Sequence, residues 1–119
     1  MAIEFGIEDR RIGDDTHVVA VRGEVDLFTA PEFKQRVMAP IAAGAEHVIV
    51  DLTETTFIDS SSLGVLIGAH RRLKSRGGRL VVACGAEPII KTFRITGLDT
   101  VFTLTDSVDA AVSLGAEAA

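Results

Sequence analysis

The sequence predicts an α/β fold built on a mixed sheet in which most strands are parallel. Segments 3–8 and 16–22 have the composition and alternation of strands, and the turn-forming residues at 10–15 between them predict an antiparallel hairpin. After the hairpin, helical and strand patterns alternate strictly, in the overall order ββαβαβαβα, which favours parallel strands joined by right-handed crossovers. Alternation alone would also fit a small flavodoxin-like domain.

The first helix is predicted between residues 29 and 44. Thr29 and Glu32 have the spacing of a capping box, in which two side chains each accept a hydrogen bond at the start of a helix. Apolar residues then recur at helical spacing from 33 to 41. Pro40 cannot donate to the helical hydrogen bonds, so the helix is expected to end or kink near it, with Gly44 as its C-terminal stop.

The segment 47–52 is nearly continuous apolar sequence, as expected for a central parallel strand that is buried on both faces. The polar residues 53–56 predict a short connection to a second helix with one apolar face. Segments 79–83 and 101–104 are the remaining predicted strands. Asp106 is positioned to cap the last helix.

A chain of 119 residues is expected to form a single domain, residues 1–119, with a core of its own. Apolar residues make up 47 % of the chain, with no Trp or Tyr, so the core is predicted to be aliphatic. The net charge of −5 argues against direct binding of nucleic acid, because phosphate backbones bind to basic surfaces. A single cysteine excludes an internal disulfide and suits a reducing compartment. With no leader pattern and no long apolar run, we expect a soluble, cytoplasmic protein without membrane insertion.

The candidate site is the segment 56–66, at the junction between the central strand and the second helix. Asp59 and three consecutive serines, Ser60, Ser61 and Ser62, stand where this helix is predicted to begin. Short oxygen-bearing side chains belong there because they accept hydrogen bonds from N–H groups that have no partner inside the helix. A cap uses only one or two of them. The surplus hydroxyls would lie at the positive end of the helix dipole, where a phosphate is tolerated, so a serine here is a candidate phosphoacceptor.

Four sequence motifs carry a resemblance to a known family. They are Gly23-Glu-Val-Asp26, Asp51-Leu-Thr followed by Phe57-Ile-Asp-Ser-Ser-Ser-Leu-Gly-Val-Leu66, Gly77-Gly-Arg-Leu-Val-Val82, and Thr96-Gly-Leu98. Together they resemble the STAS domains, and most closely the anti-sigma factor antagonists. One residue departs from the family pattern, because Ser62 stands where these proteins usually have glycine. The resemblance spans nearly the whole chain and implies the STAS fold: a mixed, mostly parallel sheet with an antiparallel N-terminal strand and strands in roughly sequential order.

The resemblance also implies a function, that of an anti-sigma factor antagonist. The unphosphorylated protein would bind an anti-sigma factor that is also a serine kinase of the histidine-kinase-like ATPase type, and would so release a sigma factor. Phosphorylation at Ser60, directly after Asp59, would switch this binding off, and a serine phosphatase would reset it. ATP and its metal belong to the kinase, so the protein itself is expected to hold no cofactor and no metal and to be no enzyme.

Ser61 and Ser62 are the alternative phosphoacceptors, and Asp26 matches a family aspartate that lies near the phosphoserine. The residues expected to contact the partner are Asp26, Asp59, Ser60, Ser61, Ser62 and Leu63.

Other functions have weaker support in the sequence. A serine hydrolase would require a G-x-S-x-G elbow and a histidine base, and neither is apparent. A receiver domain with Asp51 as phosphoacceptor would require an acidic pair after the first strand for Mg²⁺, but Glu8 and Asp9 lead into a hairpin. A STAS subunit of a membrane transporter or of a signalling assembly is the second hypothesis, and the intact pair of Asp59 and Ser60 argues against transporter modules.

Overall fold

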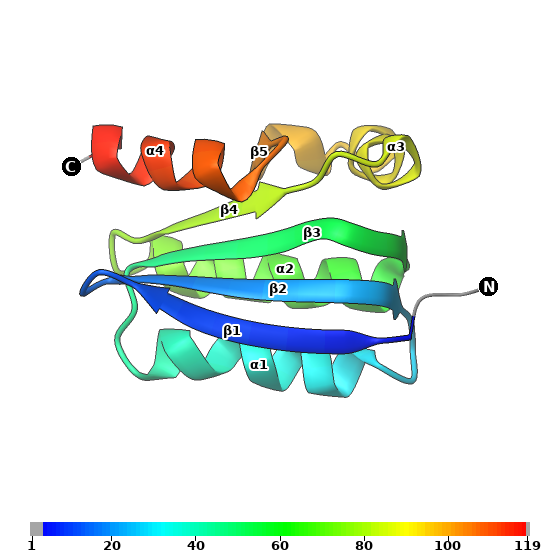
Figure 1. Ribbon diagram of the computed structural model, residues 1–119, viewed down its shortest axis with the longest axis horizontal. Helices are drawn as coiled ribbons and strands as arrows, with labels where there is room; N and C mark the ends of the chain where they lie inside the picture. Colours follow the sequence, from blue (N-terminus) through cyan, green and yellow to red (C-terminus); the bar gives the residue numbers. More distant parts are fainter. Residues whose placement is uncertain (1–3, 119) are drawn as a thin grey trace.

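The chain is organised around one five-stranded sheet, seen in a computed structural model that describes residues 4–118 (Figure 1). The spatial order follows the sequence, and β1 and β2 are antiparallel while every later pair is parallel. This confirms the predicted mixed sheet with an antiparallel N-terminal strand. The strands are β1 (Gly6–Ile12), β2 (Thr16–Val25), β3 (His47–Ile58), β4 (Arg79–Ala83) and β5 (Thr103–Thr105).

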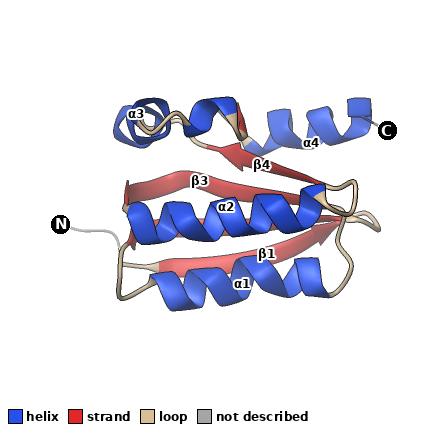
Figure 2. Cartoon of the chain, turned by 180° about the vertical axis from the view of Figure 1, so that it is seen from behind, coloured by secondary structure: helices blue, strands red, loops and turns tan. Residues whose placement is uncertain are grey.

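Helices cover both faces of the sheet. The view from behind shows α1 (Ala30–Ala42) and α2 (Ser60–Lys74) side by side over one face (Figure 2). Beyond β4 lie α3 (Glu87–Ile95), a short 3-10 helix (Leu98–Thr100) and α4 (Val108–Ala118). Within residues 4–118, none of the helices combines the length and the apolar character that crossing a bilayer requires.

The side chains of β2 and β3 alternate between two apolar clusters. Val19 and Val50 face α1 and α2, and they join the larger cluster, while Val18 and Ile49 lie with Ala111 of α4 in the smaller one. The apolar segment 47–52 is therefore buried on both faces, as its composition predicts. Burial of aliphatic side chains at about 25 cal/mol per Å² is the main force holding α1, α2 and α4 to the sheet.

The strand β3 is longer than the sequence pattern indicates. The predicted connection at 53–56 is wrong, because these residues continue the strand and pair with β2 as far as Ile58 opposite Val25. The polar side chains there lie mostly on an exposed face, and the Thr55 hydroxyl donates to the Val21 carbonyl at 2.9 Å inside the core. As a result Asp51 lies within the strand rather than at its end.

The first hairpin is shifted along the chain relative to the predicted one. β1 begins at Gly6 and runs to Ile12, so the turn is confined to residues 13–15, and Ile3 lies outside the described residues. The Arg11 guanidinium donates to the carbonyls of Gly13 and Asp14, at 3.0 and 2.8 Å, and so ties the tight turn together.

Two helix starts also differ from the predicted ones. Thr29 makes no side-chain cap toward Glu32; its hydroxyl instead accepts the N–H of Asp26, whose carboxylate accepts the N–H of Thr29. At α4 the cap is Ser107 rather than Asp106, since the Ser107 hydroxyl accepts the N–H of Ala110 at 3.1 Å. The last strand is shorter and later than predicted, because the chain first forms the 3-10 helix at 98–100.

Candidate functional site

The first turn of α2 carries the three serines. Asp59 is the cap, in an extended conformation, and its Oδ1 accepts the N–H of Ser62 at 3.2 Å. The Asp59 carboxylate is the one acidic group at this helix start, since the first turn after it holds no acidic residue, and Ser60 stands at the positive end of the helix dipole. An anion placed here would meet backbone N–H groups and a favourable dipole.

The three serines lie in different environments. Ser60 is exposed, Ser61 is half-buried, and Ser62 is completely buried. The Ser62 hydroxyl donates to the Val25 carbonyl at 2.8 Å and also lies 3.2 Å from Asp59 Oδ1. The exposure of Ser60 leaves its hydroxyl accessible from solvent. Leu63, also a predicted contact residue, is 7 % exposed and belongs to the core.

Asp26 lies beside this helix start because of the strand register. Val25 of β2 pairs with Ile58 of β3 in parallel, so the residues that follow, Asp26 and Asp59, leave the sheet at the same edge. Asp26 Oδ1 accepts the N–H groups of Phe28 and Thr29, at 2.9 and 3.1 Å. These bonds fix the loop 26–29 in a compact turn that leads into α1. The structure thus brings together the two predicted aspartates and the exposed serine.

The sequence did not identify the apolar part of this surface. Phe28 is 90 % exposed and Leu27 is 68 % exposed, both in the loop beside Asp26, and Phe57 at the end of β3 is 46 % exposed. Exposed apolar side chains that adjoin one another, as Leu27 and Phe28 do in the chain, are typical of a surface that another protein covers. The signal in the sequence was a Leu-Phe pair between a strand and a helix cap, which no helical or strand periodicity explains.

A groove runs from Ser61 along the seam between α1 and α2. Its volume is about 370 Å³, and it is open because Gly64 and Gly68 present no side chains. The lining residues are Lys34, Met38, Ser61, Gly64, Val65 and Gly68.

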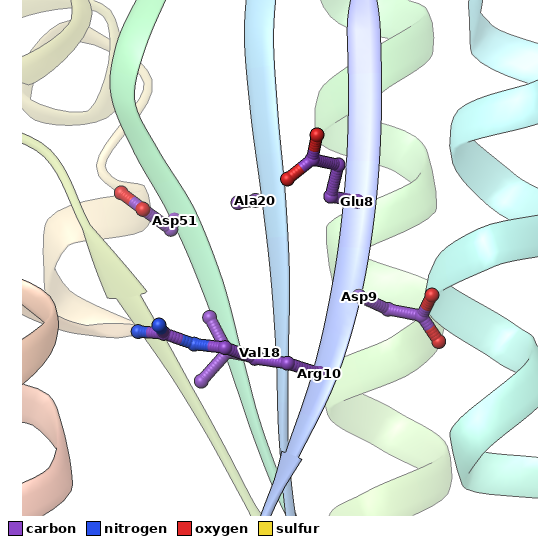
Figure 3. Close-up of a pocket in the computed structure, with 6 residues that line it drawn as sticks. All are labelled: Glu8, Asp9, Arg10, Val18, Ala20 and Asp51. Atoms are coloured by element: carbon purple, nitrogen blue, oxygen red, sulfur yellow. The ribbon is translucent and has the colours of Figure 1, made fainter.

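A second hollow, of about 180 Å³, lies on the face of the sheet that α1 and α2 do not cover (Figure 3). It contains Asp51, whose Oδ1 accepts both the N–H and the hydroxyl of Thr53, at 3.0 and 2.6 Å. Figure 3 shows Asp9 directed away from Asp51, and its carboxylate is paired with Arg36 of α1 at 2.9 Å. Glu8 lines the hollow together with Asp51, but Asp9 is held by Arg36, so the two side chains do not form the acidic pair of a receiver site.

The histidines lie away from Ser60. His17 and His47 stand near the starts of β2 and β3, at the opposite end of these strands. His70 packs edge-on against Phe102 with ring centroids 5.6 Å apart, and burial, together with the nearby Lys74 charge, lowers its pKa. Cys84 is buried, and this burial raises the pKa of its thiol, which makes it a poor nucleophile.

Within residues 4–118, the side chains that come close enough to suggest a cation are those of Asp15, Glu46 and His47, with donor atoms within 4.8 Å of one another. They lie at the far end of β3 from Ser60, and both carboxylates are exposed. The N–H groups of Glu46 and His47 both donate to the Asp15 carbonyl, which by itself holds the three residues together. Their proximity therefore has a structural cause and assigns no metal.

Comparison with known proteins gives a consistent result. The family model of the STAS domain matches residues 8–111. The anti-sigma-B factor antagonist of Listeria monocytogenes is 32 % identical over 105 residues, which cover 87 % of this chain and 90 % of that protein. The crystal structure of an anti-sigma factor antagonist from Mycobacterium paratuberculosis is 27 % identical, covers 93 % of both chains and superposes with a TM-score of 0.85. The Bacillus cell fate determinant SpoIIAA in its phosphorylated form shares the fold, with a TM-score of 0.70 at 22 % identity over 92 % of this chain and 97 % of that one.

Proposed function

Since the chain belongs to the STAS domain family, we propose that it acts as an anti-sigma factor antagonist whose partner binding is switched by phosphorylation of Ser60. The observation that carries the proposal is the exposure of Ser60 at the N-terminus of α2, beside the loop 26–29 that the Asp26 carboxylate holds in place. Its partner is an anti-sigma factor that is also a serine kinase of the histidine-kinase-like ATPase type. Binding this partner releases a sigma factor in the cytoplasm.

The phosphoacceptor is Ser60 because a kinase must reach the hydroxyl oxygen. Ser60 is exposed, whereas Ser62 is fully buried and its only proton is engaged by the Val25 carbonyl. Ser61 is half-buried and lines the groove between α1 and α2, so it is a second choice. In the reaction the kinase's ATP gives its γ-phosphoryl group to the Ser60 oxygen, the hydroxyl proton is lost, and ADP leaves. A serine phosphatase restores the hydroxyl with water and releases inorganic phosphate.

The partner docks over the surface that contains Ser60 and the exposed apolar side chains of Leu27 and Phe28 in the loop after β2. Apolar side chains that lose water on binding supply favourable free energy, and a charge that becomes buried without a partner opposes it. An unmodified serine is neutral and small, so it is compatible with such an interface. A phosphate adds about −1.5 to −2 charges at neutral pH, beside Asp59 and Asp26, and must be desolvated or matched by a cation.

The protein has no catalytic turnover of its own in this scheme and requires no cofactor, because ATP and its metal are held by the kinase. Asp59 and Asp26 accept backbone N–H groups and so shape the site, and both remain predicted contacts of the partner. The alternative is a STAS subunit of a membrane transporter or of a signalling assembly, which would use the same fold without this switch. A pull-down that recovers a histidine-kinase-like ATPase favours the first function, and recovery of a permease subunit favours the second.

The decisive experiment is kinase labelling of three single variants, Ser60→Ala, Ser61→Ala and Ser62→Ala, with the purified cognate kinase and radiolabelled ATP. We expect the first to lose all labelling and Ser61→Ala to be labelled like the unmodified protein. Full labelling of Ser60→Ala would show that another residue is the phosphoacceptor.

A further inference from the structure

Ser62 connects two segments that are distant in the sequence. Its hydroxyl, at the start of α2, donates to the carbonyl of Val25, the last residue of β2, across 37 positions of the chain. The side chain is fully buried, so water does not compete for this bond. Glycine, the residue usual in the family at this position, has no hydroxyl and cannot form it.

The segment that receives this hydrogen bond leads directly into the exposed loop. Val25 is followed by Asp26, whose carboxylate holds the N–H groups of Phe28 and Thr29. On the other side, Asp59 Oδ1 accepts the N–H of Ser62 and lies 3.2 Å from its hydroxyl. A hydroxyl has one proton, and the shorter contact, 2.8 Å to Val25, is the one that bridges the two segments.

We propose that Ser62 is a positioning residue: its hydroxyl fixes the loop 26–29 against the N-terminus of α2. The exposed serine on one segment and the pair of Leu27 and Phe28 on the other are thereby presented as one rigid surface. The hydrogen bond from Ser62 to Val25 does not depend on the proposed function, whereas its effect on a kinase rests on that function. A rigid surface loses less conformational freedom on binding, which favours the complex.

A simple capping role would predict a different pattern of effects. A residue that only supports the helix start would, when altered, loosen the first amides of α2, such as Leu63, whose N–H donates to the Asp59 carbonyl at 3.1 Å. A residue that positions the loop would also loosen amides at the loop, namely Phe28 and Thr29, whose hydrogen bonds do not include Ser62.

Amide hydrogen exchange on the full chain separates these roles without any kinase. We expect Ser62→Ala to speed exchange at Phe28 and Thr29 by about two- to tenfold, which corresponds to the net contribution of a typical hydrogen bond. Ser62→Gly, the residue usual in the family, serves as the second variant if alanine impairs folding. Ser61→Ala is the matched control in the same helical turn and should leave the loop amides unchanged. Exchange that rises only in α2, or equally throughout the sheet, would overturn the proposal.

A second measurement tests the consequence for the kinase. With the purified cognate kinase, Ser62→Ala should raise the KM for this protein by about tenfold or less while kcat stays nearly constant, since the acceptor hydroxyl of Ser60 is intact. A fall in kcat at unchanged KM would contradict a role in presenting the surface. If the kinase labels neither protein, the proposed function fails, and the exchange experiment still decides whether Ser62 positions the loop.

Discussion

Phosphorylation of Ser60 is predicted to change the charge of the site with almost no effect on the stability of the fold. Ser60 is the first residue of α2, and Asp59 next to it is the cap. An exposed anion at a helix N-terminus gains about 0.3–1 kcal/mol from the dipole. Repulsion between a phosphate of charge −2 and the Asp59 carboxylate costs about 1.4 kcal/mol if they are about 6 Å apart in water, before screening by salt.

These two contributions nearly cancel, so the free energy of unfolding should change by about 1 kcal/mol or less. For a domain of this size that corresponds to a shift in Tm of about 3–6 °C at most. The assay is thermal unfolding of the phosphorylated and unmodified proteins, together with their backbone amide NMR spectra. Shifted amides should be confined to the start of α2 and to the loop 26–29. Amide shifts throughout the sheet, or a fall in the free energy of unfolding above about 3 kcal/mol, would refute the prediction that phosphorylation changes the charge of the site without altering the fold.

Two further predictions concern particular side chains. Phe28→Ala should leave Tm unchanged, because the side chain is 90 % exposed. It should weaken binding to the anti-sigma factor by about ten- to a hundredfold, which is the range for burying one large apolar side chain. Unchanged affinity in calorimetry would contradict a place for Phe28 in the interface. The pKa of His70 is lowered in the fold by burial and by Lys74, so the folded protein binds fewer protons than the unfolded chain as pH falls through 6.5. The contribution of neutral His70 to stability is therefore present above that pH and lost below it. In urea unfolding, the free energy of unfolding of His70→Gln should depend less on pH than that of the control His17→Gln. Equal pH dependence of the two free energies would disprove this prediction.

Periodicity and turn chemistry predicted the order of the elements and the organisation of the sheet. The continuous apolar segment 47–52 predicted a strand buried on both faces, and Gly44 ends α1 with a positive φ of 102°. These features are local, because each depends on a few neighbouring residues. The resemblance to the STAS domains then distinguished this sheet from a flavodoxin-like one.

The remaining differences depend on contacts between distant residues. The length of β3 is set by its pairing with β2 through Val25, which the polar sequence at 53–56 does not indicate. Ser62 is buried where the start of α2 packs against the end of β2, and the Val25 carbonyl there accepts its hydroxyl. A sequence of three serines cannot distinguish the exposed hydroxyl from the buried one. Thr29 likewise exchanges hydrogen bonds with Asp26, although its spacing from Glu32 equally permits a capping box, and the sequence does not distinguish the two arrangements.

The affinity of the anti-sigma factor for four forms of this protein tests the central claim most directly. The forms are unmodified, phosphorylated on Ser60, Ser60→Ala and Ser60→Asp, measured by calorimetry at one salt concentration. We predict that the unmodified and Ser60→Ala forms bind equally, and that phosphorylation weakens binding at least about a hundredfold, or about 2.7 kcal/mol. Ser60→Asp should lie between them, because one carboxylate carries less charge than a phosphate. Equal affinity of the phosphorylated and unmodified forms would contradict the account.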